Sequence, residues 1–177
     1  MKEEELKCFM ENLGINKKII EFKIGKKISD NCFNTNIDKR LVNKIIDKYQ
    51  NYKKKKINNT IYYYHNKQLV ILDDSQQKCY QDNNMEKIDI ITSNMDARIL
   101  TKQRERIHVN DFPCQKNYDN ICQTKMVSIS LQNNININIH NTQNIYEISI
   151  QYIHDPNKIK IQNTETLLSI IKDMEVY

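Results

Sequence analysis

Hydrophobic and polar residues alternate along much of this chain, and a period of two predicts β-strands. The clearest case is residues 19–25, in which Ile20, Phe22 and Ile24 share one face of a strand and Glu21 and Lys23 share the other. The apolar face should pack against a core. The charged face must then meet either water or a polar interior, and this choice decides what the strand can do.

The same alternation recurs further along the chain and predicts about eight strands, mostly linked as hairpins. The predicted strands are residues 17–25, 60–65, 68–73, 86–92, 95–102, 125–132, 135–140 and 145–153. Apolar residues spaced three and four apart predict helices at 1–14, 38–52 and 162–175, and Asp38 is a suitable N-cap for the second. The four lysines at 53–56 and the asparagines after them predict a solvated loop.

This order of elements predicts an α+β fold, because the strands do not alternate with helices as they do in a Rossmann unit. An antiparallel sheet of eight strands can close into a barrel that holds side chains or one small ligand. We therefore expect a single domain over residues 1–177. An eight-stranded antiparallel β-barrel would occupy 17–154, with the helix at 38–52 inserted and about three helices at its periphery.

Composition agrees with one globular domain, since the 177 residues are 39% hydrophobic and 28% charged. The net charge of +5 suits an anionic partner. The five cysteines are odd in number and form no Cys-x-x-Cys pair, which argues against a disulfide framework and favours a reducing, intracellular location. The longest apolar runs are too short to cross a bilayer, so no membrane partner is expected.

Familiar catalytic motifs are absent: the chain has no Gly-x-Ser-x-Gly, P-loop, His-Glu-x-x-His or Gly-rich dinucleotide sequence. The four histidines show no ligand spacing and are expected on surfaces or ordinary strand positions. What remains is a set of charged residues on alternating strands. They either face water or point into the barrel, where burial would require a partner such as a triphosphate with a divalent cation.

Three segments carry a family resemblance. Residues 21–30, EFKIGKKISD, resemble the first strand of the triphosphate tunnel metalloenzymes, and in particular the yeast-type and viral RNA 5′-triphosphatases of mRNA capping, whose pattern is Glu-x-Glu-x-Lys followed by a hydrophobic residue and Gly. Residues 96–99, DARI, with a glutamate shortly beyond, resemble the family's central Asp-x-Arg-Ile strand. Residues 146–151, YEISIQ, stand where the family has a closing strand of alternating glutamates.

The resemblance implies an eight-stranded tunnel and metal-dependent removal of the γ-phosphate from triphosphate-ended RNA. It implies that Glu21 and Glu147 hold Mg²⁺ or Mn²⁺ and that Glu105 orients a basic side chain. The residues expected to grip phosphates are Lys23, Arg98, Lys87 and Lys125. The implied ligands are the 5′-triphosphate end of RNA or a nucleoside triphosphate. The implied protein partners are a guanylyltransferase, an RNA polymerase subunit or a second copy of the chain.

The chain also departs from the family pattern. Ile19 occupies the position of the first metal-binding glutamate, Ser149 and Gln151 replace two glutamates of the closing strand, and Val127 and Asn138 stand near an expected Arg and Asp. An alternative is therefore a catalytically degenerate tunnel-fold subunit with a structural or binding role in a transcription or capping complex. A third alternative is an unrelated β-rich binding protein. The expected location is nuclear for a cellular eukaryote and cytoplasmic for a virus or virus-like element.

Overall fold

The computed structural model describes residues 4, 8, 19–30, 32–64, 67–73, 78–90, 96–107, 120–132, 134–153 and 160–175. The elements are β1 (Ile19–Lys27), β2 (Phe33–Asn34), α2 (Lys39–Lys48), β3 (Lys53–Tyr64), β4 (Lys67–Asp73), β5 (Lys78–Ile90), β6 (Asp96–Ile107), β7 (Asn120–Ser130), β8 (Ile135–Thr142), β9 (Ile145–Ile153) and α3 (Lys160–Glu175). The helix expected at 1–14 lies outside the described residues, apart from Glu4 and Cys8, which are helical.

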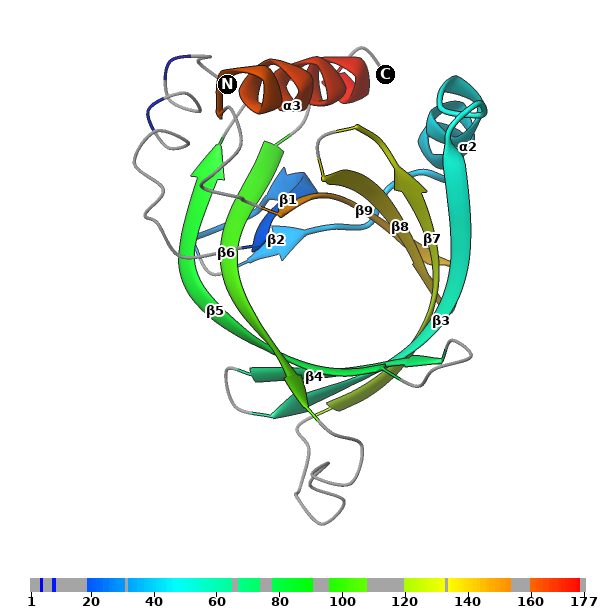
Figure 1. The fold of residues 1–177 in the computed structure, drawn as a ribbon, viewed down its shortest axis with the longest axis vertical. Coiled ribbons are helices and arrows are strands. Elements are labelled where there is room, and N and C mark those ends of the chain that lie inside the picture. The colour runs from blue at the N-terminus through cyan, green and yellow to red at the C-terminus, as the bar shows by residue number, and fades with distance from the viewer. Residues whose placement is uncertain are drawn as a thin grey trace.

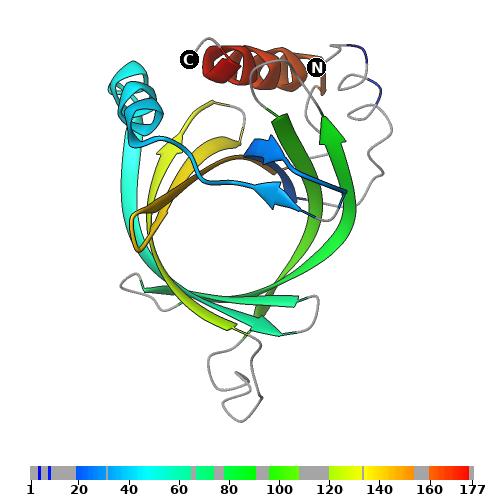
Figure 2. The same cartoon turned by 180° about the vertical axis from the view of Figure 1, so that it is seen from behind.

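The eight long strands pair antiparallel in the order β1-β6-β5-β4-β3-β7-β8-β9, and the two-residue β2 pairs with β1. This confirms the predicted eight-stranded antiparallel sheet. β1 also pairs with β9, from Ile19 opposite Ile153 to Lys23 opposite Ser149, so the two ends of the strand order meet at β1. Figures 1 and 2 show the strands arranged around a common interior, with α2 and α3 on the outside.

The hydrophobic core lies between the outer face of the sheet and the two helices. Ile20, Phe22 and Ile24 of β1 are buried on that face and belong to one core cluster with Leu41 of α2 and Leu167 of α3. Each such side chain stabilises the fold by roughly 1.5–3 kcal/mol. Because these apolar residues pack outward under the helices, the alternate residues of β1, among them Glu21 and Lys23, face the interior of the sheet, which also contains apolar side chains such as Ile57 and Met126.

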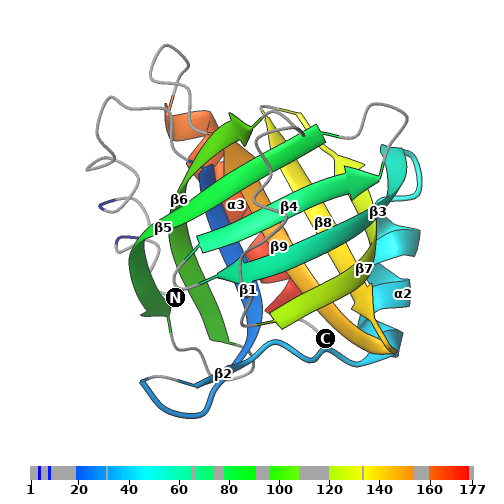
Figure 3. The same cartoon turned by 90° about the horizontal axis from the view of Figure 1, so that it is seen from below.

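Helix α2 begins where the sequence predicts. Asp38 is its N-cap, and the Asp38 carboxylate accepts a hydrogen bond from the backbone N–H of Arg40 at 2.7 Å. The helix ends at Lys48, short of the predicted residue 52, because Tyr49 leaves the helical region with φ −99° and ψ 27°. Figure 3 shows α2 on the outer side of the sheet, beside β3. Within the described ranges, no helix has both the length and the apolar character needed to cross a membrane.

The lysine run at 53–56 is the first part of β3, so the prediction of a loop there is wrong. These residues pair with β7, from Lys53 opposite Ser130 to Lys56 opposite Val127. Strand pairing satisfies the backbone groups, while the four lysine side chains remain exposed as expected. β5 and β7 likewise begin at Lys78 and Asn120, earlier than their alternation predicts, because backbone pairing continues past the apolar residues.

Candidate functional site

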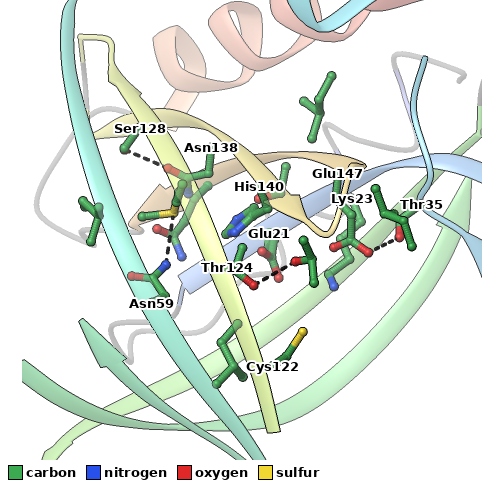
Figure 4. A pocket seen from close by; sticks show the side chains of 18 of the residues that line it. Glu21, Lys23, Thr35, Asn59, Cys122, Thr124, Ser128, Asn138, His140 and Glu147 are labelled. Atoms are coloured by element: carbon green, nitrogen blue, oxygen red, sulfur yellow. Dashed lines mark hydrogen bonds between the residues drawn. The ribbon is translucent and has the colours of Figure 1, made fainter. Parts of the chain in front are cut away.

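A polar pocket of about 380 Å³ lies inside the sheet. Its walls come from β1, β3, β6, β7, β8 and β9, with Thr35 added from the segment between β2 and α2. Glu21 and Lys23 enter the pocket from β1, as Figure 4 shows, because their neighbours Ile20, Phe22 and Ile24 point outward to the core. The charged face of the opening strand therefore meets a polar interior rather than open water.

Glu21 is held in a buried ion pair. The Lys102 ammonium of β6 pairs with Glu21 Oε2, and the two residues are only 5% and 7% exposed. In the β1–β6 ladder, Lys102 lies directly opposite Ile19, two residues before Glu21 on the same face. Burial raises the pKa of the Glu21 carboxyl, but the ammonium groups of Lys102 and Lys23 outweigh it and hold this pKa below its usual range. Glu21 is thus a carboxylate already neutralised by a lysine.

Glu147 and His140 stand side by side on β9 and β8, directly opposite one another in the ladder. The Thr35 hydroxyl donates a hydrogen bond to Glu147 Oε1. Burial lowers the pKa of the His140 imidazole, and Lys23 also lowers it, while Glu21 and Glu147 oppose the change. The net lowering keeps His140 neutral at pH 7 among charged neighbours.

The opposite wall of the pocket, formed by β3, β7 and β8, is neutral and hydrogen-bonded. Ser128 Oγ donates to Asn138 Oδ1 at 2.8 Å, and the hydroxyls of Thr124 and Thr142 lie 2.9 Å apart (Figure 4). These cross-strand pairs satisfy one another. They fix the shape of this wall. The charged side chains of the pocket therefore come from β1, β6 and β9.

Apart from Glu21 Oε2, whose partner is the Lys102 ammonium, two buried oxygens in the pocket have no hydrogen-bond partner among the described residues: Asn59 Oδ1 and Ser149 Oγ. Asn59 is 4% exposed and Ser149 is 3% exposed. Leaving such a group unsatisfied costs about 1–3 kcal/mol. Because both residues line the pocket, a ligand there can satisfy them.

Arg98 is committed to protein contacts outside the pocket lining. Its guanidinium donates to both carboxylate oxygens of Asp89, at 2.6 and 3.0 Å, and lies 4.8 Å from the centre of the Phe33 ring. Arg98 stands directly opposite Lys23 in the β1–β6 ladder, so the two residues share a face of the sheet. The structure brings Arg98 beside the pocket without making it part of the walls.

Three other residues named from the sequence are not brought to the pocket. Lys87 is exposed and donates to the backbone carbonyl of Asp30 at 3.1 Å, and Glu105 is exposed on β6. Lys125 is exposed and lines a groove between α2 and the outer face of the sheet. The period of two explains Lys125, since its neighbours Thr124 and Met126 point inward.

The sequence did not single out Lys102, His140 or Thr35 as pocket residues. The inward position of Lys102 could have been predicted, because residues 98, 100 and 102 lie on the same face of β6. The sequence carried a signal for His140 too, because it shares a strand face with Asn138; it lies on a strand, one of the two placements expected of the histidines, and its side chain lines the pocket. Thr35 had no signal, since it comes from outside the strand pattern. His65, His108 and His154 lie outside the described residues.

The donors present do not fit the divalent cation that the family resemblance implies. In the part of the chain that the structure describes, the carboxylates lining the pocket are Glu21 and Glu147, and the first is paired with Lys102 while the second accepts from Thr35. Among the described residues, no group of three or more His, Cys, Asp or Glu side chains is placed to hold a metal ion. Mg²⁺ and Mn²⁺ prefer several oxygen ligands with net negative charge.

Comparison with known proteins gives a clear answer for the fold. No family model matches the chain, and no curated protein sequence matches it. Among solved structures, the S. pombe Pct1 RNA triphosphatase in complex with the Spt5 CTD is similar with a TM-score of 0.73 at 9% identity, covering 98% of this chain and 91% of that one. The Mimivirus capping enzyme triphosphatase is similar with a TM-score of 0.58 at 11% identity, covering 98% and 95%.

A third structure, the PH1819 protein from Pyrococcus horikoshii OT3, has a TM-score of 0.55 at 12% identity and covers 88% of this chain and 89% of that one. At such low identities the likeness establishes the fold alone. The chain therefore has the tunnel fold of the fungal and Mimivirus RNA triphosphatases, as the sequence resemblance predicted. An unrelated β-rich architecture is excluded.

Proposed function

We propose that the protein is a tunnel-fold subunit of an mRNA-capping or transcription assembly that binds a 5′-triphosphate end without hydrolysing it. The observation that carries this proposal is the ion pair between Lys102 and Glu21, at the place where a metal-binding carboxylate is expected. The ladder between β1 and β9 supports a closed tunnel, with the pocket as its lumen. Such a lumen would admit the end of an RNA chain rather than a duplex.

The charges in the pocket favour binding over catalysis. Hydrolysis of a triphosphate relies on a cation that neutralises the charge developing on the phosphoryl group. Here Glu21 is already neutralised by Lys102, and Ser149 and Gln151 supply no charge where carboxylates are expected. Lys23 forms no ion pair within the described residues, so its ammonium remains available for a charge-assisted hydrogen bond to a phosphate oxygen.

The protein partner is proposed on similar grounds. One of the similar structures holds the Spt5 CTD, and the fold is shared with a capping enzyme triphosphatase. A subunit that holds an RNA 5′ end without processing it would act beside a guanylyltransferase or a polymerase. Co-purification of a tagged copy with capping and polymerase subunits, compared with a tagged unrelated protein, tests this part of the proposal.

A metal-dependent RNA 5′-triphosphatase is the second candidate, because Glu21, Lys23 and Glu147 all line one pocket. In that case the two glutamates would have to bind Mg²⁺ or Mn²⁺ after displacing Lys102 and Thr35. The two candidates predict opposite results in a single assay.

The assay measures γ-phosphate release from triphosphate-ended RNA and from a nucleoside triphosphate, with Mg²⁺ and with Mn²⁺. We expect no release above that of a Glu21→Ala variant. The wild type should bind triphosphate-ended RNA more tightly than hydroxyl-ended RNA, and Lys23→Ala should remove this preference. Lys125→Ala, a lysine change on the outer face, is the matched control and should preserve it. Release that is lost in Glu21→Ala would establish the second candidate and refute the first.

A further inference from the structure

The position of Lys102 brings a positive charge to a place where a cation would otherwise bind. Lys102 lies opposite Ile19 in the β1–β6 ladder and reaches along the strand to Glu21. Ile19 is 8% exposed and brings no charge of its own. At this end of the pocket the Glu21 carboxylate and the Lys102 ammonium are both buried and paired, with Lys23 as a second ammonium beside them, while the other carboxylate in the described lining, Glu147, accepts from Thr35.

We infer that the Lys102 ammonium replaces the divalent cation in this pocket, so that the protein binds a phosphate-bearing ligand as the metal-free anion. This inference rests on the proposed function and specifies the form of the ligand. A divalent ion placed at Glu21 would have to displace Lys102 or lie close to two ammonium groups. Either arrangement is electrostatically unfavourable in a buried site.

The contacts for the anion come from β1 and β9. Lys23 and Ser149 lie directly opposite one another in the β1–β9 ladder, and both line the pocket. Ser149 is 3% exposed, and its hydroxyl has no hydrogen-bond partner among the described residues. A hydroxyl and an unpaired ammonium on facing positions provide two donors for one phosphate group. A glutamate at position 149 would instead repel the anion.

The protonation states of the neighbours support this arrangement. The lowered pKa of Glu21 means that the Lys102 pair is a true ion pair at neutral pH rather than two neutral groups. The lowered pKa of His140 means that the imidazole is neutral at pH 7 before an anion binds. A bound anion would raise this pKa and favour the protonated imidazole. Lys23 and Lys102 are thus the cations that a ligand meets in the described part of the pocket.

Calorimetric titration with inorganic tripolyphosphate tests the inference, with EDTA in one set and excess Mg²⁺ in the other. We expect binding in EDTA, and an affinity at least about tenfold weaker in Mg²⁺, because the metal complex of the ligand carries less negative charge. Lys23→Met and Ser149→Glu should each weaken binding in EDTA at least about tenfold. Lys102→Arg keeps the cation and should retain metal-free binding. Lys125→Ala is the outer-face control.

Manganese binding, followed by the loss of the free-ion EPR signal, is the second measurement. The wild type should bind no Mn²⁺ in the pocket, and Lys102→Met should gain a site that Glu21→Gln removes again. Tripolyphosphate binding that requires a metal, or Mn²⁺ bound by the wild type through Glu21, overturns the inference but leaves the proposed RNA-end binding intact. Tripolyphosphate that binds under neither condition overturns both. Hydrolysis in EDTA overturns the proposed function while agreeing with the inference.

Discussion

The buried ion pair between Glu21 and Lys102 lines the pocket, and it also has an energetic cost for the fold. Two charges removed from water are tolerated because each compensates the other, and removing one leaves the other buried alone. A buried ion pair of this kind contributes less net stability than its attraction suggests. Its presence therefore needs a reason other than stability, and ligand binding provides one.

The first prediction concerns this pair. Glu21→Met and Lys102→Met should each lower the free energy of unfolding by about 3–5 kcal/mol, because each leaves an uncompensated buried charge. The double variant Glu21→Met/Lys102→Met should lie near the wild type, so that the two effects are strongly non-additive. Urea denaturation at neutral pH measures all three. Single variants that unfold like the wild type would show that the two groups are not paired in solution.

The second prediction concerns His140, whose pKa lies below 6.5 because burial disfavours the charged imidazole; Lys23 and Lys102 reinforce this, while Glu21 and Glu147 oppose it. Between the folded pKa and 6.5 the unfolded chain binds more protons than the folded chain. Stability should therefore fall as pH decreases below 6.5, and His140→Gln should flatten this decline.

Denaturation curves over a series of pH values test the His140 prediction. The lowered pKa of Glu21 acts in a separate window, below its ordinary value of 4.5, where protonation of the unfolded chain again destabilises the fold. The two contributions can be told apart, since only the upper window should respond to His140→Gln. An unchanged slope in that window would contradict a neutral, partly buried imidazole.

At the scale of elements, β2 depends on one glycine. A Cβ at Gly25 would lie 2.1 Å from the backbone oxygen of Asn34 and 2.8 Å from the Phe33 ring. β2 can therefore approach β1 only because position 25 carries no side chain. This approach places Phe33 against Arg98 and leads directly into Thr35, which bonds Glu147.

Gly25→Ala should force β2 away from β1. We expect a loss of stability of about 1–3 kcal/mol, as for other overpacked sites. Hydrogen exchange should also become faster at the Lys27 amide, which donates to Asp96 Oδ2 at 2.7 Å. The exposed neighbour Lys26 provides the control: its ammonium lies 3.8 Å from Asp96 Oδ2 in an ion pair whose lysine side chain is exposed to solvent, so Lys26→Ala should change stability by less than about 1 kcal/mol. Equal effects of the two changes would show that the close approach is unimportant.

The N-cap of α2 gives a further prediction. Asp38 accepts a hydrogen bond from the Arg40 amide, and Asp38→Ala should cost about 1 kcal/mol of stability. Lys39→Ala, one residue further on, removes an exposed side chain without touching the cap. Thermal denaturation of both variants tests the claim, and a stable Asp38→Ala protein would mean that the helix begins elsewhere.

Much of the fold follows from local patterns, whereas the site depends on long-range pairing. Alternation at residues 19–25 predicted both the strand and its apolar face, and Asp38 predicted the start of α2. The pair of Glu21 with Lys102 required the β1–β6 register, which places Lys102 opposite Ile19. No local signal gives that register. For Lys125 the strand was predicted correctly but the face was wrong. Lys125 is one residue out of phase with the inward-pointing residues of β7, so its side chain lies on the outer face.

At the scale of the whole molecule, the fold separates stability from pocket chemistry. The apolar residues of β1, β6, β7, β8 and β9 pack outward under the helices, and Tyr49, which follows α2 as its C-cap, donates a hydrogen bond to Asp173 of α3 at 3.0 Å. Because the core lies on the outer face of the sheet, inward residues can change without creating core cavities. This explains how a tunnel fold can persist with Ile19, Ser149 and Gln151 in place of expected carboxylates.

The most direct test of this account is a crystal structure of the protein grown with tripolyphosphate and Mn²⁺, with anomalous scattering used to locate the metal. We predict tripolyphosphate within hydrogen-bond distance of Lys23 and Ser149, Lys102 still paired with Glu21, and no manganese peak in the pocket. A manganese ion bound by Glu21 and Glu147, with Lys102 displaced, would contradict the account and support a metal-dependent triphosphatase.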